Sequence, residues 1–151
     1  ISSLFPSALL IVGDGPGYNS LAKYLKTSTL NSEKIKMVGH QDNTMEYYRT
    51  IDVCALASYK NEGVPQCGLR SMFAETPFIG SNIGGIPEII LGNQNGISFE
   101  SKDVTGIVGA IRKLQASEET RKKVIQNAKS WVLNNATSDI QYNKCLKLFC
   151  R

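Results

Sequence analysis

Four clusters of glycine follow short apolar runs, and they are the strongest sign of chemistry in the sequence. They lie at 13–17, at Gly39, at 63–68 and at 84–85. Glycine has no Cβ atom, so the backbone N–H groups beside it can approach a phosphate closely. Turns after strands also need glycine in proteins without such a site. Four clusters of this kind favour a site for an anionic ligand.

Residues that usually perform metal or nucleophilic chemistry are sparse. His40 is the only histidine, and the cysteines at 54, 67, 145 and 150 have no CxxC spacing. We therefore expect no zinc site, and a single histidine with no serine and aspartate set around it gives no catalytic triad. The sequence predicts no metal and no cofactor, and it assigns no catalytic residue. Cys54 lies in an apolar run and is predicted to be a small buried side chain.

The glycine clusters need strands and helices to position them. Apolar runs predict five short strands, at 8–12, 35–38, 53–57, 78–80 and 97–99. Helical spacing lies between them and dominates after residue 102, with helices expected at 104–115, 118–133 and 138–149. Ser58 to Gly68 is predicted to be a loop, and a helix is expected to begin at Leu69.

Strands that alternate with helices predict an α/β fold, a Rossmann-like parallel sheet with helices on both faces. The first run, 8–12, is apolar on both sides and is typical of a buried parallel strand. Each glycine cluster follows a predicted strand. Ligands of such folds bind outside the carboxyl ends of the strands, so we expect the clusters to meet at one edge of the sheet.

Length and composition indicate one globular domain, residues 1–151, with a helical C-terminal segment 102–151. Hydrophobic residues make up 42% and charged residues 20% of the 151, which excludes a disordered chain. The longest apolar run is too short to cross a bilayer. No secretory signal is visible. The sequence opens with Ile1, so we expect a preceding segment to be missing.

Charge is distributed unevenly along the chain. Residues 101–151 hold ten Lys/Arg and four Asp/Glu, a net charge of +6, whereas residues 1–100 carry −2. Such a basic segment is typical of a solvated helical face, and it also suits an anionic membrane surface. Aromatic side chains do not interleave with the basic ones, so no nucleic-acid partner is expected.

Seven short motifs in order resemble a known family. They are LIVGDGP at 10–16, KMVG at 36–39, DV at 52–53 with ASY at 57–59, EGVP at 62–65 with Met72, Ala74, Thr76 and Pro77, IGGIPE at 83–88, NG at 95–96 and SW at 130–131. Together they resemble the C-terminal half of GT-B glycosyltransferases of the large retaining family 4. The resemblance extends from about residue 6 to residue 148.

This resemblance implies a domain that binds a nucleotide sugar. The nucleobase would meet the backbone near 38–40, Glu62 would face the donor sugar hydroxyls, and the helix start at 64–69 would approach the diphosphate. A carboxylate can accept two hydrogen bonds from neighbouring hydroxyls. The predicted donor-binding residues are Gly13, Gly15, Val38, Gly39, His40, Glu62, Gly63, Val64, Pro65, Gln66, Cys67, Gly68, Leu69 and Arg70.

Two departures from the family pattern affect the prediction. The family's domain begins with a strand and a helix that carry an arginine and a lysine for the diphosphate, and this chain lacks that segment. We therefore expect the sheet to be interrupted between the strands at 8–12 and 53–57. In addition, Arg70 stands where relatives carry a glutamate that binds the ribose hydroxyls.

The resemblance predicts the donor-binding part of a retaining glycosyltransferase, inactive without the rest of a longer chain. The alternatives are a non-catalytic nucleotide-sugar-binding or regulatory module on the same scaffold, and a nucleotide-sugar epimerase, for which His40 would be the only imidazole. A phosphoacceptor receiver domain would need clustered aspartates, and Asp14 is the only one well placed. The sequence does not identify the sugar, the base or the acceptor.

The expected partners follow from the same resemblance. They are a nucleotide sugar, an N-terminal acceptor domain of the same protein and an anionic membrane surface. The expected location is the cytoplasm, with peripheral contact to the inner face of the membrane.

Overall fold

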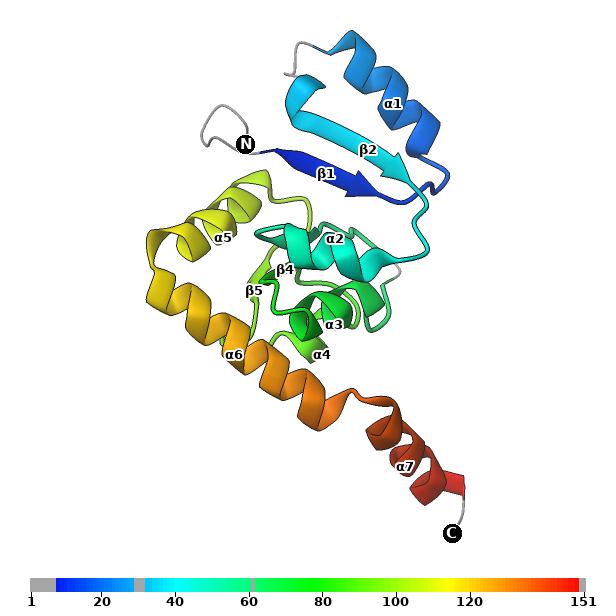
Figure 1. The fold of residues 1–151 in the computed structure, drawn as a ribbon, viewed down its shortest axis with the longest axis vertical. Coiled ribbons are helices and arrows are strands. Elements are labelled where there is room, and N and C mark those ends of the chain that lie inside the picture. The colour runs from blue at the N-terminus through cyan, green and yellow to red at the C-terminus, as the bar shows by residue number, and fades with distance from the viewer. Residues whose placement is uncertain (1–7, 29–31, 61, 150–151) are drawn as a thin grey trace. The chain divides into compact units, whose positions relative to one another are not determined.

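The computed structural model describes residues 8–28, 32–60 and 62–149 (Figure 1). The chain divides into two compact units, Ile1–Thr44 and Met45–Arg151. Each unit is described by itself.

The first unit is a strand, a helix and a second strand. β1 (Leu9–Val12) leads through the glycine turn to α1 (Tyr18–Thr27), and a 3₁₀ turn (Ser32–Lys34) precedes β2 (Ile35–Gly39). β1 and β2 are parallel, with Leu9 opposite Ile35. Both predicted strands are confirmed, and the helical crossover between them is the βαβ unit that the sequence predicts.

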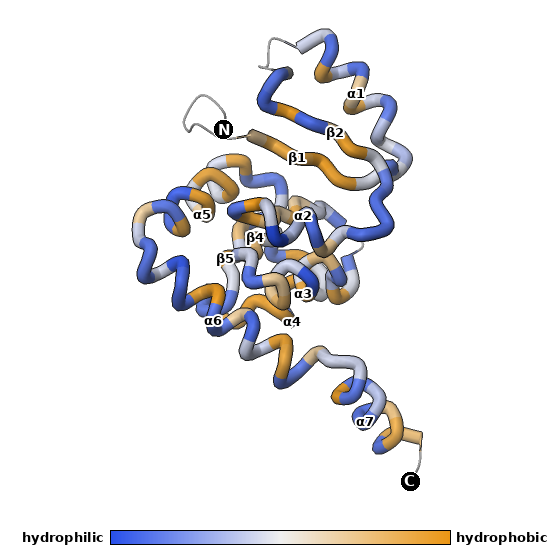
Figure 2. Tube along the Cα trace, in the orientation of Figure 1, coloured by the Kyte–Doolittle hydropathy of each residue, from blue (hydrophilic) through white to orange (hydrophobic). Residues whose placement is uncertain are grey.

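The prediction that the first strand is buried is wrong. Leu9 is 54% and Val12 is 41% exposed, although Figure 2 shows β1 coloured as strongly apolar. Within the described residues β1 forms a ladder with β2 alone. A strand at the edge of a two-stranded sheet has fewer neighbours to cover its side chains, so an apolar run there stays partly exposed.

The second unit contains a three-stranded parallel sheet. Its strands are β3 (Cys54–Leu56), β4 (Phe78–Ser81) and β5 (Ile97–Phe99), in the order β3-β4-β5. All three are predicted by the sequence, with ends that differ by at most one residue. Among the described residues the strands thus form two separate sheets, as expected from an interruption between the first and third strands.

α2 (Thr44–Thr50) precedes β3 in the chain. Five further helices lie between or after the strands of this sheet. They are α3 (Gln66–Phe73), α4 (Ile86–Ile89), α5 (Val104–Ala116), α6 (Glu118–Asn135) and α7 (Ser138–Phe149). The predicted start of α3 at Leu69 is wrong, because the helix begins three residues earlier. Glycine disfavours a helix interior, but Gly68 packs so tightly against Ile89 and Phe78 that a side chain would not fit there.

The core lies on both faces of the central strand β4. Phe78 belongs to a cluster with Met72 of α3 and Val132 of α6. Its neighbour Ile79 belongs to a second cluster, with Leu114 of α5. Successive side chains of a strand point to opposite faces, so helices cover the sheet on both sides, as predicted. Cys54 is buried in the first cluster, which confirms its predicted role.

Candidate functional site

In the first unit, the glycine turn after β1 lies against the end of β2. The N–H of Gly13 donates to the carbonyl of Gly39 at 2.8 Å. Both glycines have positive φ, 127° and 68°, in the region that disfavours residues with a Cβ atom. Two of the predicted glycine clusters therefore meet beside the carboxyl ends of neighbouring strands.

A shallow hollow of about 280 Å³ lies at this turn. Its lining residues are Ile11, Val12, Gly13, Gly15, Pro16, Gly17, Tyr18, Leu21 and Met37. Two predicted donor-binding residues, Gly13 and Gly15, are among them. The carbonyl of Val38 accepts a hydrogen bond of 2.8 Å from the side chain of Gln41, which leaves its second lone pair for a ligand.

His40 is exposed and lies between two acids. Its Nε2 atom is 3.4 Å from Asp42 Oδ1, and its Nδ1 atom is 4.0 Å from Asp14 Oδ1. Ion pairs between exposed side chains such as these contribute little to the free energy of folding. The arrangement fits a side chain that steadies the turn.

In the second unit, the loop after β3 holds the predicted sugar-binding carboxylate. Glu62 is half-buried, and its Oε2 atom accepts a hydrogen bond of 2.5 Å from the Ser58 hydroxyl. A short bond to a hydroxyl orients the carboxylate and leaves further lone pairs for a ligand. Ser58 is a candidate positioning residue that the sequence analysis did not name. Its only signal was its place in the ASY motif before Glu62.

The loop after β4 packs on the backbone of Glu62. The N–H of Gly85 donates to the Glu62 carbonyl at 3.1 Å. A Cβ atom on Gly84 would lie 2.0 Å from that same oxygen, and one on Gly85 would lie 2.6 Å from the carbonyl carbon of Gly63. Only glycine fits at either position. The other two predicted clusters, at 63–68 and 84–85, are thus brought together.

The carbonyl of Ser58 joins all three strand ends of this sheet. It accepts hydrogen bonds from Ser81, at the end of β4, at 2.6 Å and from Ser101, after β5, at 3.4 Å. These contacts fix the start of the loop that carries Glu62. The carboxylate is therefore held on a constrained backbone, and groups held in this way lose little freedom on binding.

The remaining predicted residues surround the start of α3. Pro65 caps the helix and is buried, and Gly68 is buried as well. Gly63, Val64, Gln66 and Arg70 are exposed, while Cys67 and Leu69 are partly buried. The start of α3 therefore carries several exposed residues, and the N-terminus of a helix is a favourable place for an anion.

Cys67 lies in this first turn. Burial raises the pKa of its thiol, a backbone hydrogen bond with Gly68 opposes the rise, and the Glu62 charge adds to it. Burial raises the pKa of Cys54 to about 12, with a smaller contribution from the neighbouring Cys67 thiol. Both thiols stay protonated at neutral pH, so neither is an activated nucleophile.

We expect iodoacetamide to modify the exposed Cys145 first, Cys67 much later and Cys54 only on unfolding. The thiolate is the reacting form, so the rate at Cys67 should rise with pH beyond the usual thiol range. Peptide mass spectrometry after timed labelling measures each rate. Labelling of Cys67 as fast as that of Cys145 at neutral pH would contradict this assignment.

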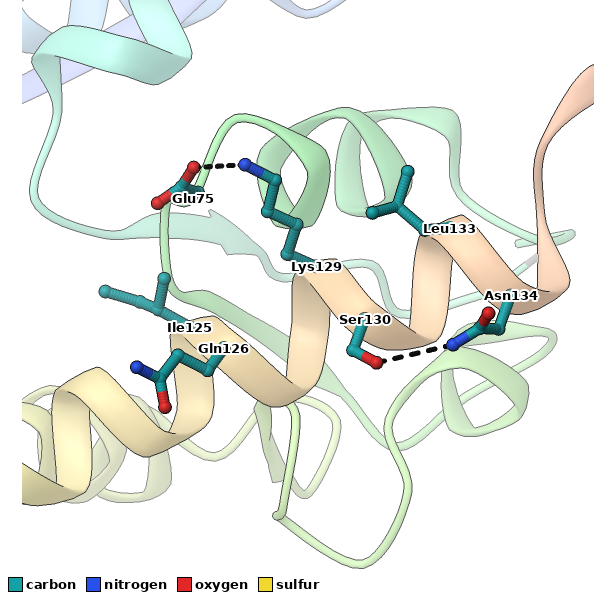
Figure 3. A pocket seen from close by; sticks show the side chains of 7 residues that line it. All are labelled: Glu75, Ile125, Gln126, Lys129, Ser130, Leu133 and Asn134. Carbon is teal, nitrogen blue, oxygen red and sulfur yellow. Dashed lines mark hydrogen bonds and ion pairs between the residues drawn. The ribbon is translucent and has the colours of Figure 1, made fainter.

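Arg70 lies on α3 one turn after its start. Its positive charge is felt at the phenol of Tyr48, whose pKa burial nevertheless raises to about 12. The next acid along this segment, Glu75, has φ 64° and pairs with Lys129 of α6, as Figure 3 shows. Glu75 therefore pairs with α6, and we do not expect it to take the place of the glutamate that the resemblance implies at position 70.

A larger hollow of about 360 Å³ surrounds that ion pair on the outer side of α6 (Figure 3). Its lining residues are Glu75, Ile125, Gln126, Lys129, Ser130, Leu133 and Asn134. None of the predicted donor-binding residues is among them. In the part of the chain that the structure describes, no three His, Cys, Asp or Glu side chains gather as metal ligands.

Comparisons with known proteins fit this arrangement. Residues 5–131 match the family described as Glycosyl transferases group 1. A curated relative is N-acetyl-alpha-D-glucosaminyl L-malate synthase of Bacillus anthracis, 30% identical over 131 residues, which are 87% of this chain and 34% of that protein. The chain thus spans about a third of the length of this relative.

Solved structures resemble the fold closely. The crystal structure of a glycosyltransferase from Rickettsia africae has a TM-score of 0.88 at 23% identity, over 98% of this chain and 41% of the other. Anabaena HepE in complex with UDP has a TM-score of 0.85 at 16% identity, over 96% of this chain and 41% of the other. HepE has also been solved with UDP-glucose.

Proposed function

This chain belongs to the family of group 1 glycosyl transferases and has the fold of the C-terminal half of a GT-B enzyme, and we propose that it is the donor-binding part of a retaining glycosyltransferase. The family moves a sugar from a nucleotide sugar to an acceptor. We further propose that residues 1–151 act as one nucleotide-sugar-binding domain within a longer protein, whose N-terminal domain holds the acceptor.

The observation that carries this proposal is the fixed loop around Glu62. Its carboxylate is oriented by Ser58, and its backbone is held by Gly85. A carboxylate with free lone pairs accepts hydrogen bonds from vicinal hydroxyls, and the α3 N-terminus four residues later offers N–H groups to a diphosphate. A nucleotide sugar presents both groups to the protein.

Replacing Glu62 by glutamine is expected to weaken the binding of UDP-glucose about tenfold and to leave UDP binding unchanged. One hydrogen bond to a charged acceptor contributes about 1.5–3 kcal/mol, and 1.4 kcal/mol is tenfold. Calorimetry with both ligands, at one protein concentration, measures the ratio. The matched control is Glu88→Gln, an exposed acid of α4.

Equal losses for UDP and UDP-glucose in the Glu62→Gln variant would place this carboxylate away from the sugar. Unchanged binding of both ligands would show that Glu62 is not part of the binding site.

A second candidate function is a non-catalytic nucleotide-sugar-binding module. Arg70 favours it, because this residue stands where relatives carry the ribose-binding glutamate. Turnover of the donor by the longer protein separates the two candidates. Donor binding without sugar transfer, across a panel of acceptors, would establish the module. The chain alone is expected to be inactive in either case.

The partner expected at the basic C-terminal segment is an anionic membrane, and we propose that α7 makes this contact. None of its residues is buried, and Leu148 and Phe149 are 71% and 84% exposed. Lys144 and Lys147 lie on the same helix. Apolar side chains with adjacent lysines suit a lipid surface that carries negative charge. No helix in the described residues is long and apolar enough to cross a membrane.

The chain should co-sediment with vesicles that contain phosphatidylserine and not with neutral ones. Each lysine near such a surface contributes about 1 kcal/mol, so the double variant Lys144→Gln with Lys147→Gln should bind about thirtyfold more weakly. The matched control changes two exposed lysines of the first unit, Lys34→Gln with Lys36→Gln. Equal losses for both pairs would indicate attraction by net charge alone.

A further inference from the structure

Two lysine side chains meet at one tyrosine ring, beside the loop that carries Glu62. The ammonium nitrogen of Lys60 lies 5.5 Å, and that of Lys102 lies 5.8 Å, from the centre of the Tyr59 ring. The two lysines come from different strand ends, after β3 and after β5. A ring face attracts a cation at such distances.

The serine contacts described above hold this cluster in place. Ser101 donates to the carbonyl of Ser58, so Lys102 follows one fixed residue and Tyr59 follows the other. Lys102 itself has a positive φ of 67°, a backbone conformation uncommon for a residue with a Cβ atom. The backbone thus directs a cation of the β5 loop toward the β3 loop.

No acid that the structure describes forms a direct ion pair with the cluster. In the described ranges neither Lys60 nor Lys102 has a carboxylate within ion-pair distance. The nearby acids have other partners: Glu62 accepts from Ser58, Glu100 from Asn82, and Asp103 from Thr105. Each ammonium group thus lies near the Tyr59 ring without a direct ion-pair partner among the described residues, and an anion that reached both would be attracted by each charge.

We propose that Lys60, Tyr59 and Lys102 form a phosphate-binding site at the carboxyl edge of the sheet. The ammonium groups supply charge-assisted hydrogen bonds to the phosphate oxygens, and the ring of Tyr59 holds both lysines near it. That the phosphate belongs to the transfer reaction rests on the proposed function. It would then come from the donor diphosphate or from a phosphorylated acceptor.

The first experiment titrates the whole chain with inorganic phosphate and follows the ring signals of Tyr59 by NMR. We expect saturable binding, weakened about tenfold or more in the double variant Lys60→Gln with Lys102→Gln. The matched control is Lys113→Gln with Lys123→Gln, two exposed lysines of α5 and α6, which should bind phosphate as the parent does. Unchanged binding in the first pair, or equal losses in both, overturns the site.

A second titration identifies the source of the phosphate. If UDP displaces inorganic phosphate from the Tyr59 signals, the site serves the donor; if phosphate still binds at saturating UDP, the site serves the acceptor. If phosphate binds here and UDP binds nowhere, the proposed function fails while the phosphate site stands. If the NMR signals of the Tyr59 ring do not change in either titration, the inference is overturned.

Discussion

Replacing Gly84 by alanine is expected to lower the free energy of unfolding by about 2–5 kcal/mol and to weaken UDP-glucose binding by about two orders of magnitude. The φ of Gly84 is 56°, and holding a residue with a Cβ atom there costs about 1–2 kcal/mol. The new Cβ atom would also lie 2.0 Å from the Glu62 carbonyl oxygen. Overpacking of this kind adds about 1–3 kcal/mol.

The loss of binding follows from the same clash. The Glu62 backbone must move away from the alanine, which breaks the hydrogen bond from Gly85 and shifts the carboxylate. A displacement of about 1 Å in a positioned group can cost about two orders of magnitude in function. The two loops therefore act as one unit, in which the glycines after β4 set the position of the acid after β3.

Gly92 provides a matched control for the strain. Its φ is 54°, close to that of Gly84, but a Cβ atom there would meet nothing within 4 Å. Gly92→Ala should therefore cost only the backbone strain, about 1–2 kcal/mol, and leave UDP-glucose binding intact. Urea denaturation of both variants, with calorimetry for binding, measures the difference. Equal losses of stability in the two variants would show that the close approach of the Glu62 carbonyl to residue 84 does not add to the cost of the alanine side chain.

The strands were predictable because each one is an apolar run closed by glycine, proline or a polar residue. This local signal is enough for β4 and β5, which are buried as expected of strands in this sheet. It is not enough for the exposure of β1, since burial depends on which segments lie on either side of a strand. The apolar residue types of Leu9 and Val12 do not show which segments lie beside β1, so they do not predict its exposure.

The candidate site was predictable in its residues and less so in its geometry. The motif around Glu62 marks the carboxylate, but the bond from Ser58 and the contact with Gly84 depend on how two loops fold against each other. The early start of α3 has the same origin. Gly68 is a poor helix former by itself, and it lies in the helix because Ile89 and Phe78 leave no space for a side chain.

Changing Arg70 to glutamate is expected to tighten UDP-glucose binding by the longer protein about five- to 150-fold. Arginine has five donors and no acceptor, so it cannot accept from the two ribose hydroxyls as a glutamate does. Hydrogen bonds to a charged group contribute about 1–3 kcal/mol, which corresponds to that range. Arg70 is exposed on α3 and acts electrostatically on Tyr48 rather than lying in the core, so the exchange should leave the fold intact.

Two comparisons separate the ribose contact from a grip on phosphate. Arg70→Gln removes the positive charge without adding a carboxylate, and it should change UDP-glucose affinity little if the ribose contact is simply lost in the parent. The gain from Arg70→Glu should also shrink for 2′-deoxy-UDP-glucose, which offers the new carboxylate one hydroxyl fewer. If Arg70 instead binds the diphosphate, both variants lose affinity for UDP and for UDP-glucose alike, because a cation near two phosphates stabilises either ligand equally. Calorimetry with these ligands therefore decides whether the residue weakens the donor site or supplies part of the charge that relatives hold on another segment.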